Sequence, residues 1–280
     1  MNGRNIFVAL DCHVHLYQLG DLPKLLQAAV RNARHVQLHT QETPWRLDGQ
    51  PVLPTLILTE LNSRDSFAVI MKLAMSPGGD SIHGWRFEAG GDGLSIFARH
   101  DDGEVALIIS GQQIVTKERL EILAIACRPD VENGLELTNT LSEIRHRDAA
   151  AVFPWGVGKW LGRRGRLLDA ALAAGKPGDF ALSDTASRPF CWPEPRLAAA
   201  AQRGFMVLRG ADPLPLAGQV EHVGAFGTLA NIVFDDERPA LSVVAALKSD
   251  VTAMKAFGSR QSPFAFCRAQ LLFRLTRLSR

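Results

Sequence analysis

Apolar runs alternate with segments of helical spacing along most of this chain. The run from Ile6 to Leu16 is nearly continuous and indicates a buried strand, and residues 22–33 follow with apolar positions at helical spacing. The same alternation returns between residues 137 and 208, with helices predicted at 137–147, 165–174 and 195–203 and strands at 150–153, 180–182 and 205–208. Strands that alternate with helices favour a parallel sheet, either open or closed into a barrel.

The middle of the chain has a different pattern. Short strands are predicted at 85–88, 94–98 and 105–110, separated by turns rich in Gly and Asp, which is typical of a β-meander or hairpin insertion. The apolar run 122–126 is too short to assign to a strand or a helix. We therefore expect one α/β domain over residues 1–280, with a β-rich insertion at about 83–110 and an amphipathic helix at about 262–278.

Composition narrows the class of protein. The 280 residues carry 31 basic and 29 acidic side chains, a net charge of +2, and 46% are hydrophobic. Such a balance indicates a globular protein and argues against a nucleic-acid footprint, which is a clustered basic excess. No apolar stretch is long enough for a membrane helix. The four cysteines form no C-x-x-C pair, which argues against a zinc knuckle or disulfide scaffold and favours reduced thiols in a cytoplasmic protein.

The sharpest chemical signal is LDCHVHLY at residues 10–17. Alternate side chains of a strand share a face, so Asp11, His13 and His15 should point the same way. Two imidazoles at the carboxyl end of a strand can hold a divalent metal. The alternative is that they are polar residues at the mouth of a barrel.

A second signal is FPWGVGKWLGRRG at residues 153–165. Its glycines permit close approach of backbone to a ligand, and Lys159, Arg163 and Arg164 lie just before a predicted helix that begins near Gly165. This arrangement suits a phosphate or carboxylate, and Arg188 lies where it could join the site. The alternative is a solvated basic loop above packed tryptophans.

The order of these segments resembles the polymerase and histidinol phosphatase (PHP) family of metal-dependent phosphoesterases. LDCHVHLY is similar to the family's opening D-x-H-x-H strand, and LTELN at 58–62 lies where the family has T-D-H-N. GQQIVTKERLEILAI at 111–125 is similar to the stretch G-x-E-I followed by E-x-H-I-L-G. Phe153-Pro154 stands where a His-Pro pair is expected, and GADPLP at 210–215 resembles the closing G-S-D-x-H.

The resemblance implies a PHP-like distorted barrel, but only part of the family's metal-ligand set. His13, His15 and Asp212 occupy ligand positions, with Glu121 standing where a histidine would be. Other ligand positions hold Gln113, Leu61, Phe153 and Leu214. A divergent member with one divalent metal (zinc, manganese or iron) on His13, His15, Asp212 and Glu121 is consistent with this set, and so is a descendant without metal.

The leading hypothesis is a metal-dependent hydrolase of an anionic small molecule, in which the metal activates a water and the basic loop holds the anion. Asp11 or Asp184 would orient a ligand or move a proton. The alternative is a catalytically inactive PHP-like binding or scaffold protein that has lost its metals. Amidohydrolase chemistry also begins from H-x-H, but it needs later strand-end histidines that this chain lacks in the corresponding places.

The C-terminal stretch from Val251 onward contains no acidic residue, and its apolar residues follow helical spacing with arginines between them. A basic amphipathic helix of this kind lies on an anionic membrane, closes a barrel or packs at a homo-oligomer interface. The sequence leaves these three possibilities open.

Overall fold

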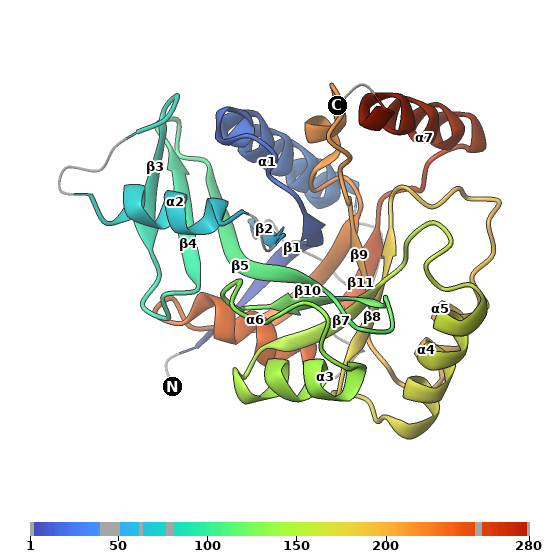
Figure 1. The fold of residues 1–280 in the computed structure, drawn as a ribbon. Helices are drawn as coiled ribbons and strands as arrows, with labels where there is room; N and C mark the ends of the chain where they lie inside the picture. The colour runs from blue at the N-terminus through green and yellow to red at the C-terminus, as the bar shows by residue number, and fades with distance from the viewer. Residues whose placement is uncertain (1–2, 40–50, 62–63, 77–80, 250–253, 279–280) are drawn as a thin grey trace.

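The computed structural model describes residues 3–39, 51–61, 64–76, 81–249 and 254–278. In this part of the chain, one sheet curves into a nearly closed barrel with helices around it (Figure 1). The strands are β1 (Arg4–Val14), β2 (Val52–Glu60), β3 (Trp85–Ala89), β4 (Ser95–His100), β5 (Val105–Val115), β6 (Glu121–Ile125), β7 (Ala150–Pro154), β8 (Ala181–Thr185), β9 (Val207–Gly210), β10 (Gly227–Phe234) and β11 (Met254–Phe257).

The helices are α1 (Leu22–His39), α2 (Ser66–Ala74), α3 (Leu137–His146), α4 (Gly162–Ala174), α5 (Pro195–Gln202), α6 (Pro239–Leu247) and α7 (Pro263–Leu278), with 3-10 turns η1 (Leu19–Asp21) and η2 (Gln219–His222). Among these helices, none is both long and apolar enough to cross a membrane.

The expected α/β barrel with a small β insertion is confirmed. The strand order is β11-β10-β1-β2-β5-β6-β7-β8-β9, and β3 and β4 form a hairpin that joins the sheet through β5. The ambiguous run 122–126 lies in strand β6 and the residue after it.

The parallel pairing that the alternation favours is present in two groups of strands, which are joined by an antiparallel strand. β1, β2 and β5 are parallel, as are β7, β8 and β9, but β6 runs antiparallel to both β5 and β7. The connection at 116–120 is too short for the crossover that a parallel pair requires, so β6 has to return beside β5 in the opposite direction. β10, which was not predicted, pairs antiparallel with β1.

The barrel interior is filled by alternate apolar side chains of the strands. Leu10 of β1, Ile109 of β5 and Leu208 of β9 belong to one buried cluster. Val243 and Leu247 of α6 pack into the same cluster, so this helix covers part of the barrel core (Figure 1). The carboxyl ends of the parallel strands are left for polar side chains, as in other α/β barrels.

β9 is an edge strand of the sheet, and hydrogen bonds join the chain that follows it to β1. The Asp212 N–H donates to the His13 carbonyl at 2.8 Å, and the Ala211 N–H donates to Asp11 Oδ1 at 2.9 Å. This closure brings the chain after β9 directly beside the H-x-H segment.

Candidate metal centre

Three of the predicted ligands come together where the chain after β9 meets the end of β1. The Nε2 atoms of His13 and His15 lie 3.1 Å apart, and Asp212 Oδ1 lies 3.6 Å from the first and 3.7 Å from the second. Both imidazoles are almost completely buried, whereas the Asp212 side chain keeps 23% of its surface exposed. The three donors therefore converge on one point that remains open on the carboxylate side.

The spacing of these donors fits a divalent cation. Ligands at about 2.0–2.1 Å from a tetrahedral ion lie roughly 3.3 Å from one another. The observed separations of 3.1 to 3.7 Å bracket that value. Two imidazole nitrogens and one carboxylate leave a fourth position for water or substrate, which is the composition of a catalytic rather than a structural site.

His13 Nε2 has more acceptors around it than one proton can satisfy. Besides His15 and Asp212, the Gln113 side-chain Oε1 lies 3.2 Å away, while His13 Nδ1 is buried without a hydrogen-bond partner among the described residues. All polar contacts of this ring thus pass through Nε2. By the family resemblance, Gln113 occupies the position of a glutamate ligand. In the structure, its amide oxygen lies beside His13 of the cluster.

Burial keeps the His15 imidazole neutral. Burial is the main cause that lowers the pKa of His15 to about 4, and the neighbouring His13 lowers it further. A hydrogen bond with the backbone of Thr59 acts in the opposite direction and orients the ring. A neutral imidazole offers a lone pair to a cation, so this environment suits coordination.

Asp212 owes its position to the turn that follows β9. Its backbone has φ of +47°, a left-handed conformation that Asp adopts more readily than most residues. The turn is held by the hydrogen bonds of the Asp212 and Ala211 N–H groups to β1. These contacts aim the carboxylate back at the two histidines.

Asp11, predicted as a catalytic residue, is fully buried behind this turn. Its carboxylate accepts hydrogen bonds from the backbone N–H groups of His13 at 3.3 Å, Ala211 at 2.9 Å and Gly224 at 2.9 Å. Burial raises the pKa of Asp11 to about 7, against the lowering effect of those three donors. The contacts give Asp11 a role in tying β1 to two later segments.

Glu121, predicted as a fourth metal ligand, does not join the group of donors formed by His13, His15 and Asp212 within the described structure. It forms an ion pair with Lys159 instead. The Lys159 charge contributes to lowering the pKa of His15, after burial and the neighbouring His13. Glu121 therefore binds a cationic side chain of the protein rather than joining the three donors.

Asp184 and Arg188 are also engaged with each other. The Arg188 guanidinium donates to both carboxylate oxygens, Nε to Oδ1 at 2.7 Å and Nη2 to Oδ2 at 2.6 Å, and both side chains are over 90% buried. Arg188 also donates to the Trp192 carbonyl and lies over the Trp155 ring. The structure thus places Arg188 in a buried pair in which its donors have partners within the protein.

The two remaining basic residues of the glycine-rich segment differ in position. Arg164 donates to the Gly158 carbonyl at 2.8 Å and so stabilises the loop itself. Arg163 is exposed in the first turn of α4. Lys159, the other predicted anion-binding residue of this segment, pairs with Glu121, and its charge acts on the pKa of His15.

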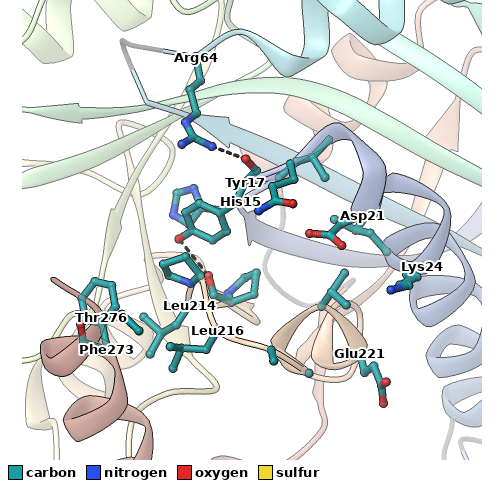
Figure 2. A pocket seen from close by; sticks show the side chains of 18 of the residues that line it. His15, Tyr17, Asp21, Lys24, Arg64, Leu214, Leu216, Glu221, Phe273 and Thr276 are labelled. Atoms are coloured by element: carbon teal, nitrogen blue, oxygen red, sulfur yellow. Dashed lines mark hydrogen bonds between the residues drawn. The ribbon is translucent and has the colours of Figure 1, made fainter. Parts of the chain in front are cut away.

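A cavity of about 930 Å³ extends from His15. Figure 2 shows His15 and Tyr17 reaching into it, with Asp21 and Lys24 on the side of η1 and α1 and Arg64 extending from the segment before α2. Phe273 and Thr276 of α7 and apolar residues of the 213–216 segment line the opposite side. The Tyr17 hydroxyl donates to the Pro213 carbonyl at 3.1 Å and Arg64 donates to the Tyr17 carbonyl. These lining residues lie on segments far apart in the sequence, so no local sequence pattern could predict the cavity.

The positions at which the resemblance placed other histidines carry no ligand. Phe153 is fully buried in the core, Leu61 is exposed at the end of β2, and Leu214 lines the cavity. Asn62 of the LTELN segment lies outside the described residues. Among the described residues, the cluster therefore contains fewer metal ligands than the family resemblance implies.

Comparison with known proteins supports the fold. No protein-family model and no curated protein matches the sequence. The structure is similar to that of PsfC from Pseudomonas syringae PB-5123, with a TM-score of 0.55 and 16% identity over 99% of both chains.

Two weaker similarities were also found. A two-domain protein containing a predicted PHP-like metal-dependent phosphoesterase from Bacteroides vulgatus ATCC 8482 aligns with a TM-score of 0.47 and 12% identity over 92% of this chain and 66% of that one. The lesion-specific endonuclease PfuEndoQ from Pyrococcus furiosus aligns with a TM-score of 0.49 and 12% identity over 90% of this chain and 58% of that one. Since one fold carries many activities, the function has to be inferred from the side chains.

Proposed function

We propose that this chain is a PHP-like, metal-dependent hydrolase that cleaves a phosphate ester or a similar anionic ester of a small molecule. The observation that carries the proposal is the convergence of His13, His15 and Asp212, with donor atoms 3.1 to 3.7 Å apart, next to an open cavity. These residues would hold one divalent ion of zinc, manganese or iron. When bound, such an ion supplies a nucleophilic water at neutral pH and neutralises charge on the ester.

The chain's own residues have separable roles in this proposal. Burial keeps His15 neutral, so that its lone pair is available without the release of a proton at neutral pH. Lys159, oriented by its ion pair with Glu121, would attract the anionic group and stabilise the charge that develops on it. The contacts of Asp11 and Asp184 support positioning roles and give no support to proton transfer by either residue.

The decisive measurement is metal content. The purified protein is incubated with zinc, manganese or iron, dialysed and analysed by mass spectrometry of the bound metal. We expect stoichiometric metal in the wild type and its loss in His13→Ala/His15→Ala. The variant His146→Ala is the matched control, because this histidine is exposed on α3, and it should retain the metal. The proposal is wrong if the wild type stays empty with all three metals.

Hydrolysis is tested separately with p-nitrophenyl phosphate and its diester. Asp212→Asn should keep the fold, judged by circular dichroism, and lose metal affinity and activity together. A wild type that binds metal stoichiometrically but hydrolyses neither these esters nor a panel of natural phosphate esters would contradict the hydrolase and indicate a metal-binding protein without this activity.

The kinetics of a Lys159 variant provide a third, independent test. Lys159→Met should leave the metal content unchanged, since the ammonium is not a ligand, and should raise KM for anionic substrates. The loss of one charge-assisted hydrogen bond corresponds to about 1.5–3 kcal/mol, or roughly ten- to hundredfold in kcat/KM. An unchanged kcat/KM would exclude Lys159 from anion binding.

A further inference from the structure

Helix α7 has apolar residues on two opposite faces. The inner face packs on the rest of the protein. Ala269 is buried, the ring centroids of Phe266 and Trp192 lie 6.3 Å apart, and Phe273 lines the cavity that reaches His15. On the outer face, Phe264 is 79% exposed and Leu271 is 60% exposed. Packing on the core explains the apolar residues of the inner face, but it does not explain those of the outer face.

The outer apolar residues form a continuous stripe. At about 100° per residue, positions 264, 271 and 275 fall within roughly 40° of one another on the helix surface. Leu275 is 53% exposed and the neighbouring Leu272 is 42% exposed. Figure 1 shows α7 at the edge of the molecule, with one side away from the barrel. Large apolar side chains exposed together in this way mark an interaction surface.

Positive charges flank this stripe on both sides. Arg268 and Arg274 are exposed, and within the described residues neither forms an ion pair. Residues 251–280 contain six basic residues and no acidic one. An apolar stripe between arginines, with no carboxylate on the helix, is complementary to a surface that is apolar inside and anionic at its boundary.

A second copy of the chain is a poorer fit. Two α7 helices packed through the same stripe would bring arginine against arginine, because residues 263–278 offer no carboxylate to pair with them. We propose that α7 docks the protein on the surface of an anionic lipid bilayer, with Phe264 and Leu271 entering the acyl boundary and Arg268 and Arg274 binding lipid phosphates.

Docking through the outer face has a consequence for the cavity. Phe273 and Thr276, on other sides of the same helix, line the cavity that contains His15. The candidate metal centre would therefore lie beside the lipid surface, within reach of molecules held there. This consequence does not depend on which reaction the centre carries out.

Co-sedimentation with vesicles tests the proposal. The wild-type protein should sediment with vesicles of phosphatidylglycerol and phosphatidylcholine at low salt, and it should remain in solution with phosphatidylcholine alone. Arg268→Gln/Arg274→Gln should weaken the partition coefficient about thirtyfold, the factor that corresponds to ~1 kcal/mol for each arginine. Phe264→Ser/Leu271→Ser should weaken it by about tenfold or more.

Matched variants separate the helix from general surface properties. Arg166→Gln/Arg203→Gln removes two exposed charges elsewhere, and Met75→Ser/Val233→Ser removes two exposed apolar side chains. All variants are compared with the wild type by thermal unfolding, and both control pairs should bind as the wild type does.

Three results would overturn the proposal. The first is a wild type that does not bind anionic vesicles, and the second is equal binding to neutral and anionic vesicles. The third is a dimer in analytical ultracentrifugation that Phe264→Ser/Leu271→Ser converts to a monomer, which would show that a second copy covers the stripe.

Discussion

At the scale of single residues, the buried Asp184–Arg188 pair is the clearest case in which contacts decide a role. Removing one partner of a buried, bidentate ion pair leaves the other charge without compensation. Arg188→Met should therefore lower the free energy of unfolding by about 3–5 kcal/mol, measured by urea denaturation. The exposed Arg163 is the control, and Arg163→Met should change stability by less than about 0.5 kcal/mol. An unchanged stability with a raised KM in Arg188→Met would instead support a substrate-binding role for Arg188.

Asp11 offers a second test at this scale. In Asp11→Asn, an amide N–H₂ replaces one of the two oxygens that accept backbone N–H groups, so that a donor faces a donor. We expect the free energy of unfolding to fall by about 1–3 kcal/mol. Metal affinity should fall with it, because the Ala211 N–H anchors the turn that carries Asp212. If Asp11→Asn kept the stability and metal affinity of the wild type and lost only hydrolysis, Asp11 would instead be a catalytic residue.

At the scale of elements, the site depends on how closely β9 approaches β1. A Cβ atom at Gly210 would lie 2.6 Å from His13 Cβ and 2.7 Å from the His13 backbone nitrogen. Real Cβ atoms do not approach backbone so closely, so Gly210→Ala must push β9 away from β1. The expected cost is about 1–3 kcal/mol of stability, together with weaker metal binding because Asp212 moves with β9.

Gly20→Ala is the matched control for this effect. An added Cβ at Gly20 meets nothing within 4 Å, and its φ is not in the left-handed region. This variant should be neutral or slightly stabilising in the same denaturation and metal-binding measurements. Equal behaviour of the two glycine variants would contradict the close approach of β9 to β1.

At the scale of the whole molecule, buried carboxyl groups make stability depend on pH. Burial raises the pKa of Glu60 from 4.5 to about 7, although its side chain accepts a hydrogen bond from the Phe67 N–H at 3.2 Å. The folded state therefore binds the Glu60 proton more tightly than the unfolded state does. This contribution to stability is complete below about pH 4.5 and is lost as the pH rises to about 7.

Glu60→Gln keeps an oxygen acceptor for Phe67 and removes the titration. At pH 8, the variant should be more stable than the wild type by roughly 3 kcal/mol, and the difference should vanish near pH 4. Urea denaturation with a chelator present measures both limits without any bound metal. A difference that is the same at both pH values would show that Glu60 does not titrate between them.

The family resemblance places His13, His15 and Asp212 in one ligand set, and the structure brings these three residues together. Glu121 was placed in the cluster, but it pairs with Lys159 because the antiparallel β6 places its first residue opposite Val115. The contact of Gln113 with His13 joins residues a hundred positions apart, so no local pattern could reveal it.

The sequence by itself determined the alternation of elements, the β insertion, the basic amphipathic C-terminal helix and the residue types able to bind a metal or an anion. These features are encoded locally, in apolar periodicity and in the chemistry of neighbouring residues. Only the tertiary structure decided the antiparallel placement of β6 and β10, the buried partners of Asp11 and Arg188, and the cavity beside His15. The physical reason is that each of these depends on barrel closure, which brings distant segments within hydrogen-bonding distance and sets which charges are buried, paired or left open to a ligand.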